Sequence, residues 1–326
     1  MMLEKLNRWL QKLLPIITPI SVIIGVLFAD YLAQWTFIVP WVFAMMTFSG
    51  SLSSNFHSVK EVFLRPLPLL FVLILLHIVM PLWAYGIGSI VFQNAYTITG
   101  LVLGMAIPTG ITSFVWVLIY KGNIGLALSV ILIDTLLSPI IVPATLALLV
   151  GERVPFHVGP LMSGFFFMIV LPSLIGMTLN QLSSGTIKDS LGATLAPFSK
   201  LGIGIVVSIN SAAVAPYLRH IDYELILIAS TVFVISMSGY LLAWVVGILT
   251  KQNRENRVTL LFCGGMRNIS AGAVMAVQYF PPPVAVPVVV GMLFQQVLAS
   301  IFGTVFAKTE RNTLGSRELE KVERSS

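Results

Sequence analysis

The fold of this chain is decided by residues 101–150, which read LVLGMAIPTGITSFVWVLIYKGNIGLALSVILIDTLLSPIIVPATLALLV. The charged residues within this stretch are Lys121 and Asp134. A short polar turn that begins at Lys121 separates two apolar runs, 97–120 and 124–149. Each run is long enough to cross the hydrocarbon core of a bilayer, which is about 30 Å thick. The stretch therefore predicts two consecutive transmembrane helices.

The same pattern extends over the whole chain of 326 residues, of which 57% are hydrophobic and 10% charged. Soluble globular chains carry about 25% charged residues. A soluble fold could not hide this much apolar surface, because surface-to-volume scaling leaves too much of it facing water. We therefore predict an all-α polytopic membrane protein with about ten transmembrane helices. The apolar runs lie at roughly 13–33, 36–53, 67–92, 97–120, 124–149, 160–182, 196–217, 223–250, 257–279 and 283–307.

Composition also restricts the partners. A net charge of +6 could indicate a nucleic-acid partner, but the basic residues are scattered between apolar runs. We therefore expect the lipid bilayer as the partner surface and no nucleic acid. The single cysteine, Cys263, excludes an internal disulfide framework. We expect no cofactor and no metal, because His57, His157 and His220 fall in loops without the spacing of metal ligands.

The N-terminus is basic and amphipathic over residues 1–12 and apolar from Leu13 to about Trp35. A cleaved signal peptide would have a shorter apolar core and a small-residue cleavage site. We interpret residues 1–12 as a cytoplasmic interfacial segment and the following run as an uncleaved span.

Lysine and arginine predict the orientation of the spans. With ten spans, sixteen of the nineteen Lys and Arg residues fall on one side of the membrane. Arg153 and Arg219 fall on the other side, and Arg267 lies within a span. Because positively charged loops stay in the cytoplasm, we predict a multi-pass protein of the plasma (inner) membrane with both termini cytoplasmic.

Ten spans divide into two five-helix repeats, 13–149 and 160–307, followed by a cytoplasmic tail at 308–326. An odd number of spans in each half gives the halves opposite orientations, which is typical of secondary transporters. Each half should then contain a broken helix at the matching place. Span four contains Pro108-Thr109-Gly110, and span nine contains the segment from Gly264 to Asn268. Proline removes a helix donor and glycine permits unwinding, although two merely kinked helices would also explain these residues.

These motifs, in this order, resemble those of the bile acid:sodium symporter (BASS) family over nearly the whole chain. The resemblance is carried by short segments that include the two breaks. They are Leu76-His77-Ile78-Val79-Met80-Pro81, Pro108 to Ser113, Lys121-Gly122-Asn123, Thr135 to Pro139, Gly265 to Asn268 and Val284 to Pro287.

The resemblance implies a panel domain of spans 1, 2, 6 and 7 and a core domain of spans 3–5 and 8–10. It also implies two crossing broken helices, spans 4 and 9, in the core. Family members carry organic anions such as bile acids, keto acids and pantoate-like acids by alternating access, driven by two sodium ions.

The residues that the family uses to bind sodium are largely replaced in this chain. Sodium is a hard cation that needs several oxygen ligands. A Ser-Asn pair after the first crossover corresponds here to Ser113-Phe114, and the remaining positions also lack oxygen ligands. Two hydroxyl residues correspond to Ala127 and Ile131, a carboxylate to Cys263, and two glutamines to Leu76 and Arg267. We therefore predict that the usual two-sodium arrangement is absent.

Arg267 and Asp134 are the ionisable residues predicted to lie deepest in the membrane. An intramembrane charge costs at least about 2.5–3.5 kcal/mol and normally has a partner. Our hypothesis is that Arg267 replaces a sodium charge and attracts the substrate, with Asp134 as its counter-ion and proton carrier. A static ion pair without a coupling role would also explain the two residues. His77 could carry a proton, because histidine often serves as a proton shuttle, but it could equally be a hydrogen-bonded core residue.

Substrate contacts are expected beside the breaks, where half-helix N-termini direct positive dipole ends at anions. The candidates are Thr109, Thr112, Ser113, Arg267 and Asn268. Ser and Thr in spans often bond only to their own helix. Further polar residues, which helix packing explains equally well, are Ser208, Asn210, Gln295 and Gln296.

The sequence thus predicts a secondary active transporter of a small organic anion, coupled to protons or to no ion rather than to sodium. The alternative is a conventional sodium-coupled organic anion symporter whose ligands are rearranged. An intramembrane enzyme is not expected, because no nucleophile with a base and no metal cluster is present. A channel would show polar helix faces along whole spans, whereas polarity here gathers at the two breaks.

Overall fold

A computed structural model describes residues 2–53, 66–151, 153–219 and 221–323. The described part is helical. The predicted loop residues His57 and His220 lie outside it, as do three of the basic residues used to predict orientation, Lys60, Arg65 and Arg324.

The helices follow the predicted apolar runs. Eight of them are long and apolar enough to cross a membrane, among the residues that the structure describes. The predicted runs 13–33 and 97–120 correspond instead to shorter apolar helices, Ile16–Leu27 and Ala95–Ala106. The chain is therefore a polytopic helical membrane protein, and the predicted count of ten spans is not confirmed by the eight described helices that meet the length criterion.

The first half of the chain contains α1 to α9. In order they are α1 (Met2–Leu27), α2 (Ala29–Leu32), a 3-10 turn (Ala33–Ile38), α3 (Val39–Ser51), α5 (Leu67–Ile74), a π-helical turn (Leu75–Val79), α6 (Met80–Val91), α7 (Ala95–Ala106), α8 (Thr112–Ile119) and α9 (Ile124–Val150). α1 is one continuous helix, so no break separates residues 2–12 from the rest of it.

The second half contains α10 to α17. In order they are α10 (Val158–Phe165), a π-helical turn (Phe166–Val170), α11 (Leu171–Leu182), a π-helical turn (Lys188–Gly192), α12 (Ala193–Ala213), α13 (Ala215–Leu218), α14 (Tyr223–Leu249), α15 (Arg254–Gly265), α16 (Ile269–Tyr279) and α17 (Pro282–Glu323). The predicted tail at 308–326 continues the last span as helix to Glu323.

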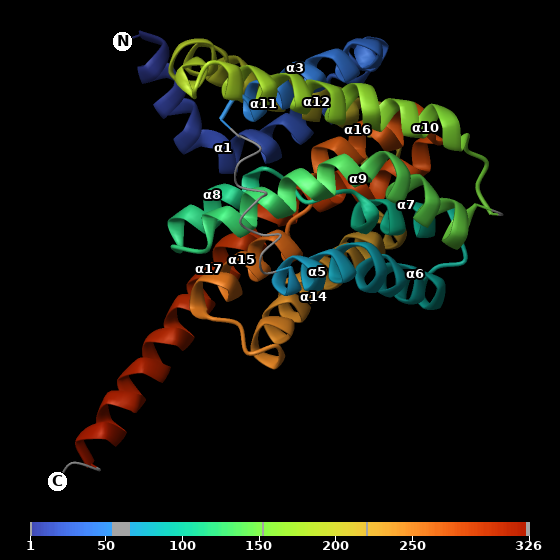
Figure 1. Ribbon diagram of the computed structural model, residues 1–326. Helices are drawn as coiled ribbons and strands as arrows, with labels where there is room; N and C mark the ends of the chain where they lie inside the picture. Colours follow the sequence, from blue (N-terminus) through green and yellow to red (C-terminus); the bar gives the residue numbers. More distant parts are fainter. Residues whose placement is uncertain (1, 54–65, 152, 220, 324–326) are drawn as a thin grey trace.

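The helices form two layers. α12 packs against α1 and α3, and α3 packs against α11; with α10 these helices make the upper layer in Figure 1. α7 packs against α6, α9 and α17 in the other layer, which also holds α5, α8 and α14 to α16. These layers correspond to the helices that the family resemblance assigned to a panel and a core.

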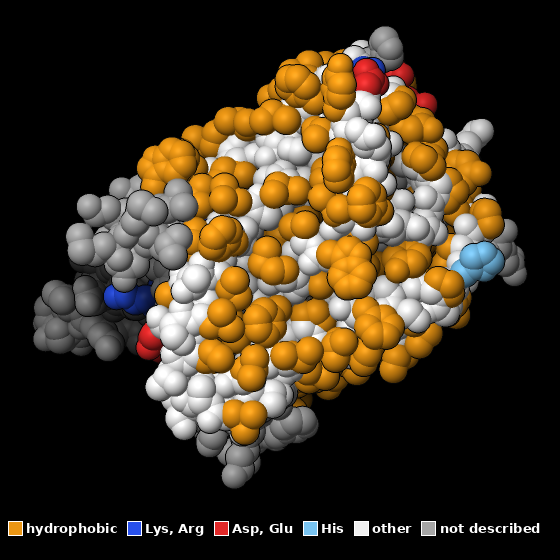
Figure 2. Space-filling model, turned by 90° about the horizontal axis from the view of Figure 1, so that it is seen from above, with side chains coloured by type: hydrophobic (Ala, Val, Ile, Leu, Met, Phe, Trp, Pro, Cys, Tyr) orange, Lys and Arg blue, Asp and Glu red, His pale blue; other side chains and the backbone are white. Residues whose placement is uncertain are grey.

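The outer surface is apolar. Figure 2 shows a face covered by hydrophobic side chains, with charged side chains only near its edges. Large apolar residues such as Trp41, Phe167 and Leu148 are well exposed to the surroundings. An apolar patch of this extent fits lipid as the surrounding solvent.

Two spans carry a π-helical turn that is followed, after one residue, by a single proline. The Met80 amide donates a hydrogen bond to the carbonyl of Leu75, five residues earlier, and Pro81 follows. Leu171 donates to Phe166 in the same way, and Pro172 follows. Proline lacks an amide hydrogen and its ring crowds the preceding turn, and a widened turn accommodates it. The first of these turns contains His77.

Candidate functional site

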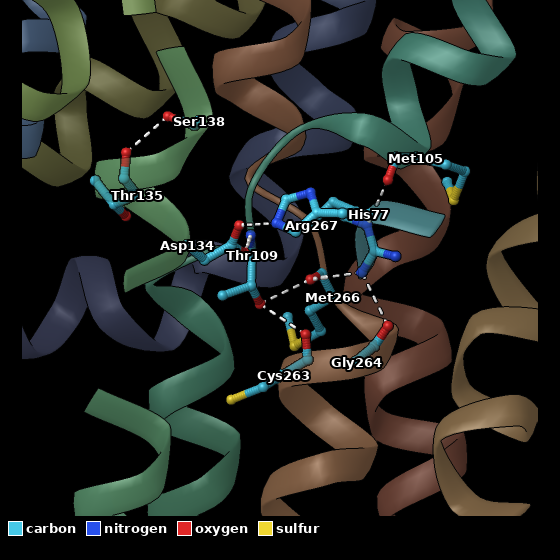
Figure 3. Close-up of polar contacts among 10 residues, drawn as sticks. All are labelled: His77, Met105, Thr109, Asp134, Thr135, Ser138, Cys263, Gly264, Met266 and Arg267. Atoms are coloured by element: carbon cyan, nitrogen blue, oxygen red, sulfur yellow. Dashed lines mark hydrogen bonds and ion pairs between the residues drawn. The ribbon is translucent and has the colours of Figure 1, made fainter. Parts of the chain in front are cut away.

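The site is built around two breaks in otherwise helical spans. Residues 107–111 separate α7 from α8, and residues 266–268 separate α15 from α16. The two breaks cross in direct contact, because the Asn268 amide donates to the Pro108 carbonyl at 2.7 Å. The predicted broken helices of spans four and nine are therefore present. Four half-helix ends meet in the middle of the molecule (Figure 3).

Proline and glycine allow this crossing. Pro108 has no amide hydrogen with which to continue α7. Gly110 lies so close to the second break that a Cβ there would approach the Arg267 carbonyl oxygen to 2.9 Å. The side chain of Asn268 then starts α16, by accepting the Ala271 amide at 3.3 Å.

Arg267 binds the C-terminal ends of the two half-helices. Its Nε donates to the Met105 carbonyl of α7 at 3.0 Å, and Nη1 donates to the Gly264 carbonyl of α15 at 2.9 Å. Nη1 also lies 3.4 Å from the Met266 carbonyl. These carbonyls belong to the negative ends of two helix dipoles, so the buried guanidinium places a positive charge where that charge is favoured.

Asp134 of α9 is hydrogen-bonded to the first break and lies on the other side of the crossing from Arg267. Its Oδ2 accepts the Thr109 amide at 2.6 Å, and its Oδ1 lies 2.7 Å from His77 Nε2. The carboxylate is fully buried, and the His77 side chain is 7% exposed. The other ring nitrogen of His77, Nδ1, is buried without a hydrogen-bond partner. Asp134 therefore joins α9, the π-helical turn and the first break.

Thr109 links the two breaks. Its hydroxyl lies 2.8 Å from the Cys263 carbonyl and 3.0 Å from the Met266 carbonyl, and it can donate to either. The result is a continuous polar network from His77 through Asp134 and Thr109 to the end of α15, beside Arg267 (Figure 3).

The predicted direct pairing of Asp134 with Arg267 is absent among the ion pairs of the described residues. Asp134 instead binds His77, and Arg267 binds main-chain carbonyls. The reason is geometric: the carboxylate approaches the crossing from α9, whereas the guanidinium lies over the ends of α7 and α15 (Figure 3). Each buried group has hydrogen-bond partners of its own, although Arg267 Nη2 is buried without one.

The positions that correspond to the family's sodium ligands are mostly enclosed by apolar side chains. Leu76, Ala127 and Cys263 are fully buried in a cluster that also contains Phe262 and Tyr240. Ser113 is also fully buried, and its Oγ lies 3.7 Å from Cys263 Sγ. In the described part of the chain, no group of three or more His, Cys, Asp or Glu residues could hold a metal ion.

Two cavities flank the crossing. The larger, of about 480 Å³, lies between the layers and is bordered by Thr112, Arg267 and Asn268. The smaller, of about 70 Å³, is bordered by Thr109, Thr135 and Asn268 on the α9 side. Of the predicted substrate contacts, Thr112 and Asn268 thus border the larger cavity together with Arg267. Ser113 borders neither and points into the core.

The structure brings in residues that sequence reasoning did not single out. Lys200 of α12 lines the larger cavity, opposite the crossing. Trp116 also lines it, and Trp116 Nε1 donates to Gln296 Oε1 at 3.1 Å. Lys200 was assigned to the basic side of the membrane. The available signal was its place within an apolar run, after Pro197 and before Leu201.

Comparison with known proteins gives consistent matches. Residues 39–221 match the model of the sodium bile acid symporter family. The Bacillus subtilis protein YbaS is 51% identical over 298 residues, which cover 91% of this chain and 97% of YbaS. YocS of the same organism, named as a sodium-dependent transporter, is 25% identical over 91% of this chain and 92% of its own length. A rice chloroplast protein named as a sodium/metabolite cotransporter, BASS1, is 24% identical over 78% of this chain and 62% of its own length.

Proposed function

The chain belongs to the sodium bile acid symporter family, and from this premise we propose that it carries a small organic anion by alternating access without the family's two sodium ions. Membership makes the protein a multi-pass membrane transporter and not an enzyme. The proposal adds the type of substrate and the nature of the coupling.

One observation carries the proposal: the Arg267 guanidinium binds the Met105 and Gly264 carbonyls, at the C-terminal ends of both half-helices. Sodium bound there would need carbonyl and side-chain oxygens. The guanidinium already occupies the carbonyls and supplies the positive charge. A second cation at the same place would meet electrostatic repulsion in a low-dielectric interior.

The buried pair of His77 and Asp134 is the proposed proton carrier. A carboxylate and an imidazole nitrogen 2.7 Å apart can share one proton, and histidine often serves as a proton shuttle. Asp134 also accepts the Thr109 amide, so a change in the charge of Asp134 would alter this hydrogen bond at the crossing. The other ionisable side chains buried around the crossing are Arg267, Cys263 and Tyr240.

The substrate anion would bind in the larger cavity, beside Thr112, Asn268 and the positively charged Arg267. Half-helix N-termini at α8 and α16 add positive dipole ends there. The uneven distribution of Lys and Arg supports a location in the plasma (inner) membrane with both termini in the cytoplasm.

The second candidate is a conventional sodium-coupled symporter. It is favoured by the names of relatives such as YocS, a sodium-dependent transporter, and the rice sodium/metabolite cotransporter. Backbone carbonyls and rearranged side chains would then have to provide the ligands.

The thermal stability of the purified protein in sodium, potassium and choline chloride separates the two candidates. A ligand that binds only the folded state raises stability by mass action. We expect equal unfolding temperatures in the three salts. A saturating stabilisation by sodium alone, at millimolar concentrations, would overturn the proposal in favour of sodium coupling.

Proton coupling is tested in proteoliposomes that contain a pH-sensitive dye, to which pantoate, valerate or glutarate is added. We expect proton movement together with the transported acid.

Asp134→Asn keeps an acceptor for the Thr109 amide but removes the charge, so it should abolish coupled proton movement while leaving substrate exchange. His77→Gln should act in the same direction, and His157→Gln, at an exposed position, is the control. Unchanged proton movement in Asp134→Asn would exclude this carrier.

A further inference from the structure

The larger cavity has an unusual charge distribution. It measures about 480 Å³, and the charged side chains that line it are Arg267 and Lys200, with no carboxylate among its lining residues. This volume is within the range of small-molecule sites, roughly 300–1,000 Å³. A cavity with cations on its walls concentrates anions, because low-dielectric walls focus the field.

The two cations belong to different layers. Arg267 lies in the crossing, whereas Lys200 lies on α12 of the upper layer. The Lys200 ammonium donates to the main-chain carbonyl of Asn7 at 3.2 Å and to the side-chain oxygen of Asn7. A lysine within a span marks a functional position by default, because it is expensive to keep there.

The rest of the cavity has polar groups at the crossing and apolar walls beyond it. Thr112, Asn268 and Ser270 lie at the crossing. Ile111, Val115, Ile119, Ile203, Ile269 and Met292 provide apolar surface in the same cavity. A ligand that matches this lining has a charged group at the crossing, a short hydrocarbon portion, and a second negative group that reaches Lys200.

We propose that the substrate is a dianion, such as a short dicarboxylate, whose two negative groups are bound by the crossing and by Lys200. This inference rests on the proposed function and narrows its substrate class. One carboxylate binds beside Thr112, Ser270 and Arg267. The other binds the Lys200 ammonium, which can form a charge-assisted hydrogen bond with it.

A dianion would also connect the two layers. Its contacts would extend from the crossing to α12, so it would stabilise a conformation in which both layers close on it. A ligand shifts a conformational equilibrium only by its difference in affinity for the two states. A monoanion of equal length lacks the contact with Lys200, so it binds more weakly and closes the layers less.

The test compares glutarate with valerate, a five-carbon dianion and a five-carbon monoanion, on the purified full chain. Binding is measured by the rise of the unfolding temperature as each acid is titrated, with pantoate as a further probe. We expect half-saturation at about tenfold lower concentration for glutarate than for valerate, the size of one charge-assisted hydrogen bond. Lys200→Gln should remove this preference, because it weakens the binding of glutarate more than that of valerate, and Lys200→Arg should retain it.

Asn7→Ala is the matched control, because it removes one side-chain acceptor of Lys200 without removing the charge, and it should keep the preference for glutarate. If glutarate and valerate bind equally well to the wild-type protein, or if Lys200→Gln keeps the preference, the dianion proposal is wrong while the proposed function stands. If valerate, glutarate and pantoate all fail to bind, the proposed function itself is overturned.

Discussion

At the scale of single residues, Arg267 differs from a bound sodium ion in one physical respect: it cannot leave. Its guanidinium presents several donors in a fixed plane, and two of its nitrogens bind carbonyls from two separate helices. Hydrogen bonds to a charged group contribute about 1.5–3 kcal/mol each. The crossing therefore remains closed by a permanent side chain rather than by an exchangeable ligand.

This view predicts a gain of sodium binding in the double variant Cys263→Glu with Arg267→Gln. The change removes the permanent cation and supplies two side chains with oxygen atoms beside the vacated carbonyls, the ligand type that a hard cation needs. We expect the unfolding temperature of the double variant to be higher in sodium chloride than in potassium chloride, unlike that of the wild-type protein.

Arg267→Gln alone is the control for this experiment. It removes the cation without supplying a carboxylate, so we expect lower stability in both salts and no difference between them. Equal stability of the double variant in the two salts would mean that Arg267 does not occupy a sodium position.

The sequence was sufficient to predict that Arg267, Asp134 and His77 lie in the membrane, because charge in an apolar run is visible without a structure. It was not sufficient to predict their partners. The carbonyl of Met105 becomes an acceptor only because α7 ends beside Arg267. Such a pairing depends on the relative placement of residues 162 positions apart in the chain.

At the scale of helices, the crossing depends on how closely the backbones of the two breaks approach each other. A Cβ on Gly110 would lie 2.9 Å from the Arg267 carbonyl oxygen and 3.2 Å from its carbonyl carbon. Backbone atoms cannot move aside as a flexible side chain can. The first break therefore tolerates no side chain at this position without separation of the two breaks.

We predict that Gly110→Ala destabilises the protein by about 1–3 kcal/mol, the usual effect of overpacking, and slows transport. Thermal unfolding and the rate of substrate exchange would measure the two effects. Gly104→Ala on α7 is the matched control, because a Cβ there has no neighbouring atom within 4 Å. Similar stabilities for the two variants would contradict a tight crossing.

The two breaks were predictable because Pro108, Gly110 and the Gly264-Gly265 pair are strong local signals. The π-helical turn at Leu75–Val79 was not predicted. Prolines occur in many transmembrane helices, and a proline can produce a kink, a broken turn or a widened turn. Which of these forms depends on the packing of the neighbouring helices, and here the widened turn carries the histidine that meets Asp134.

At the scale of the whole molecule, the larger cavity and a second cavity, which is lined by acidic residues, lie toward opposite ends of the spans. The larger cavity is lined by Trp116 and Ile119, close to the turn at Lys121. A separate cavity of about 270 Å³ is lined by Tyr217, Asp222 and Glu224, at the end that contains Arg219. The larger cavity, where we propose that the substrate binds, is thus nearer the membrane face that we propose to be cytoplasmic.

This arrangement predicts sided labelling by a membrane-impermeant thiol reagent. Cys263 is fully buried, so the wild-type protein should give little background. We expect Ser270→Cys, in the larger cavity, to react in inside-out vesicles and to be protected by glutarate. Tyr217→Cys should react in right-side-out vesicles. Reaction of both variants from the same side would contradict the proposed orientation.

The attachment of Arg267 to the protein has a consequence for the electrical balance of a transport cycle. A sodium ion crosses with the substrate and is released, so it adds its charge to the cargo. In the proposed cycle the guanidinium would return with the empty carrier, so its charge would cancel over a complete cycle. The net current is then that of the substrate and any accompanying proton. A dianion with one proton would carry one net negative charge, and a voltage negative inside would drive it out of the cell.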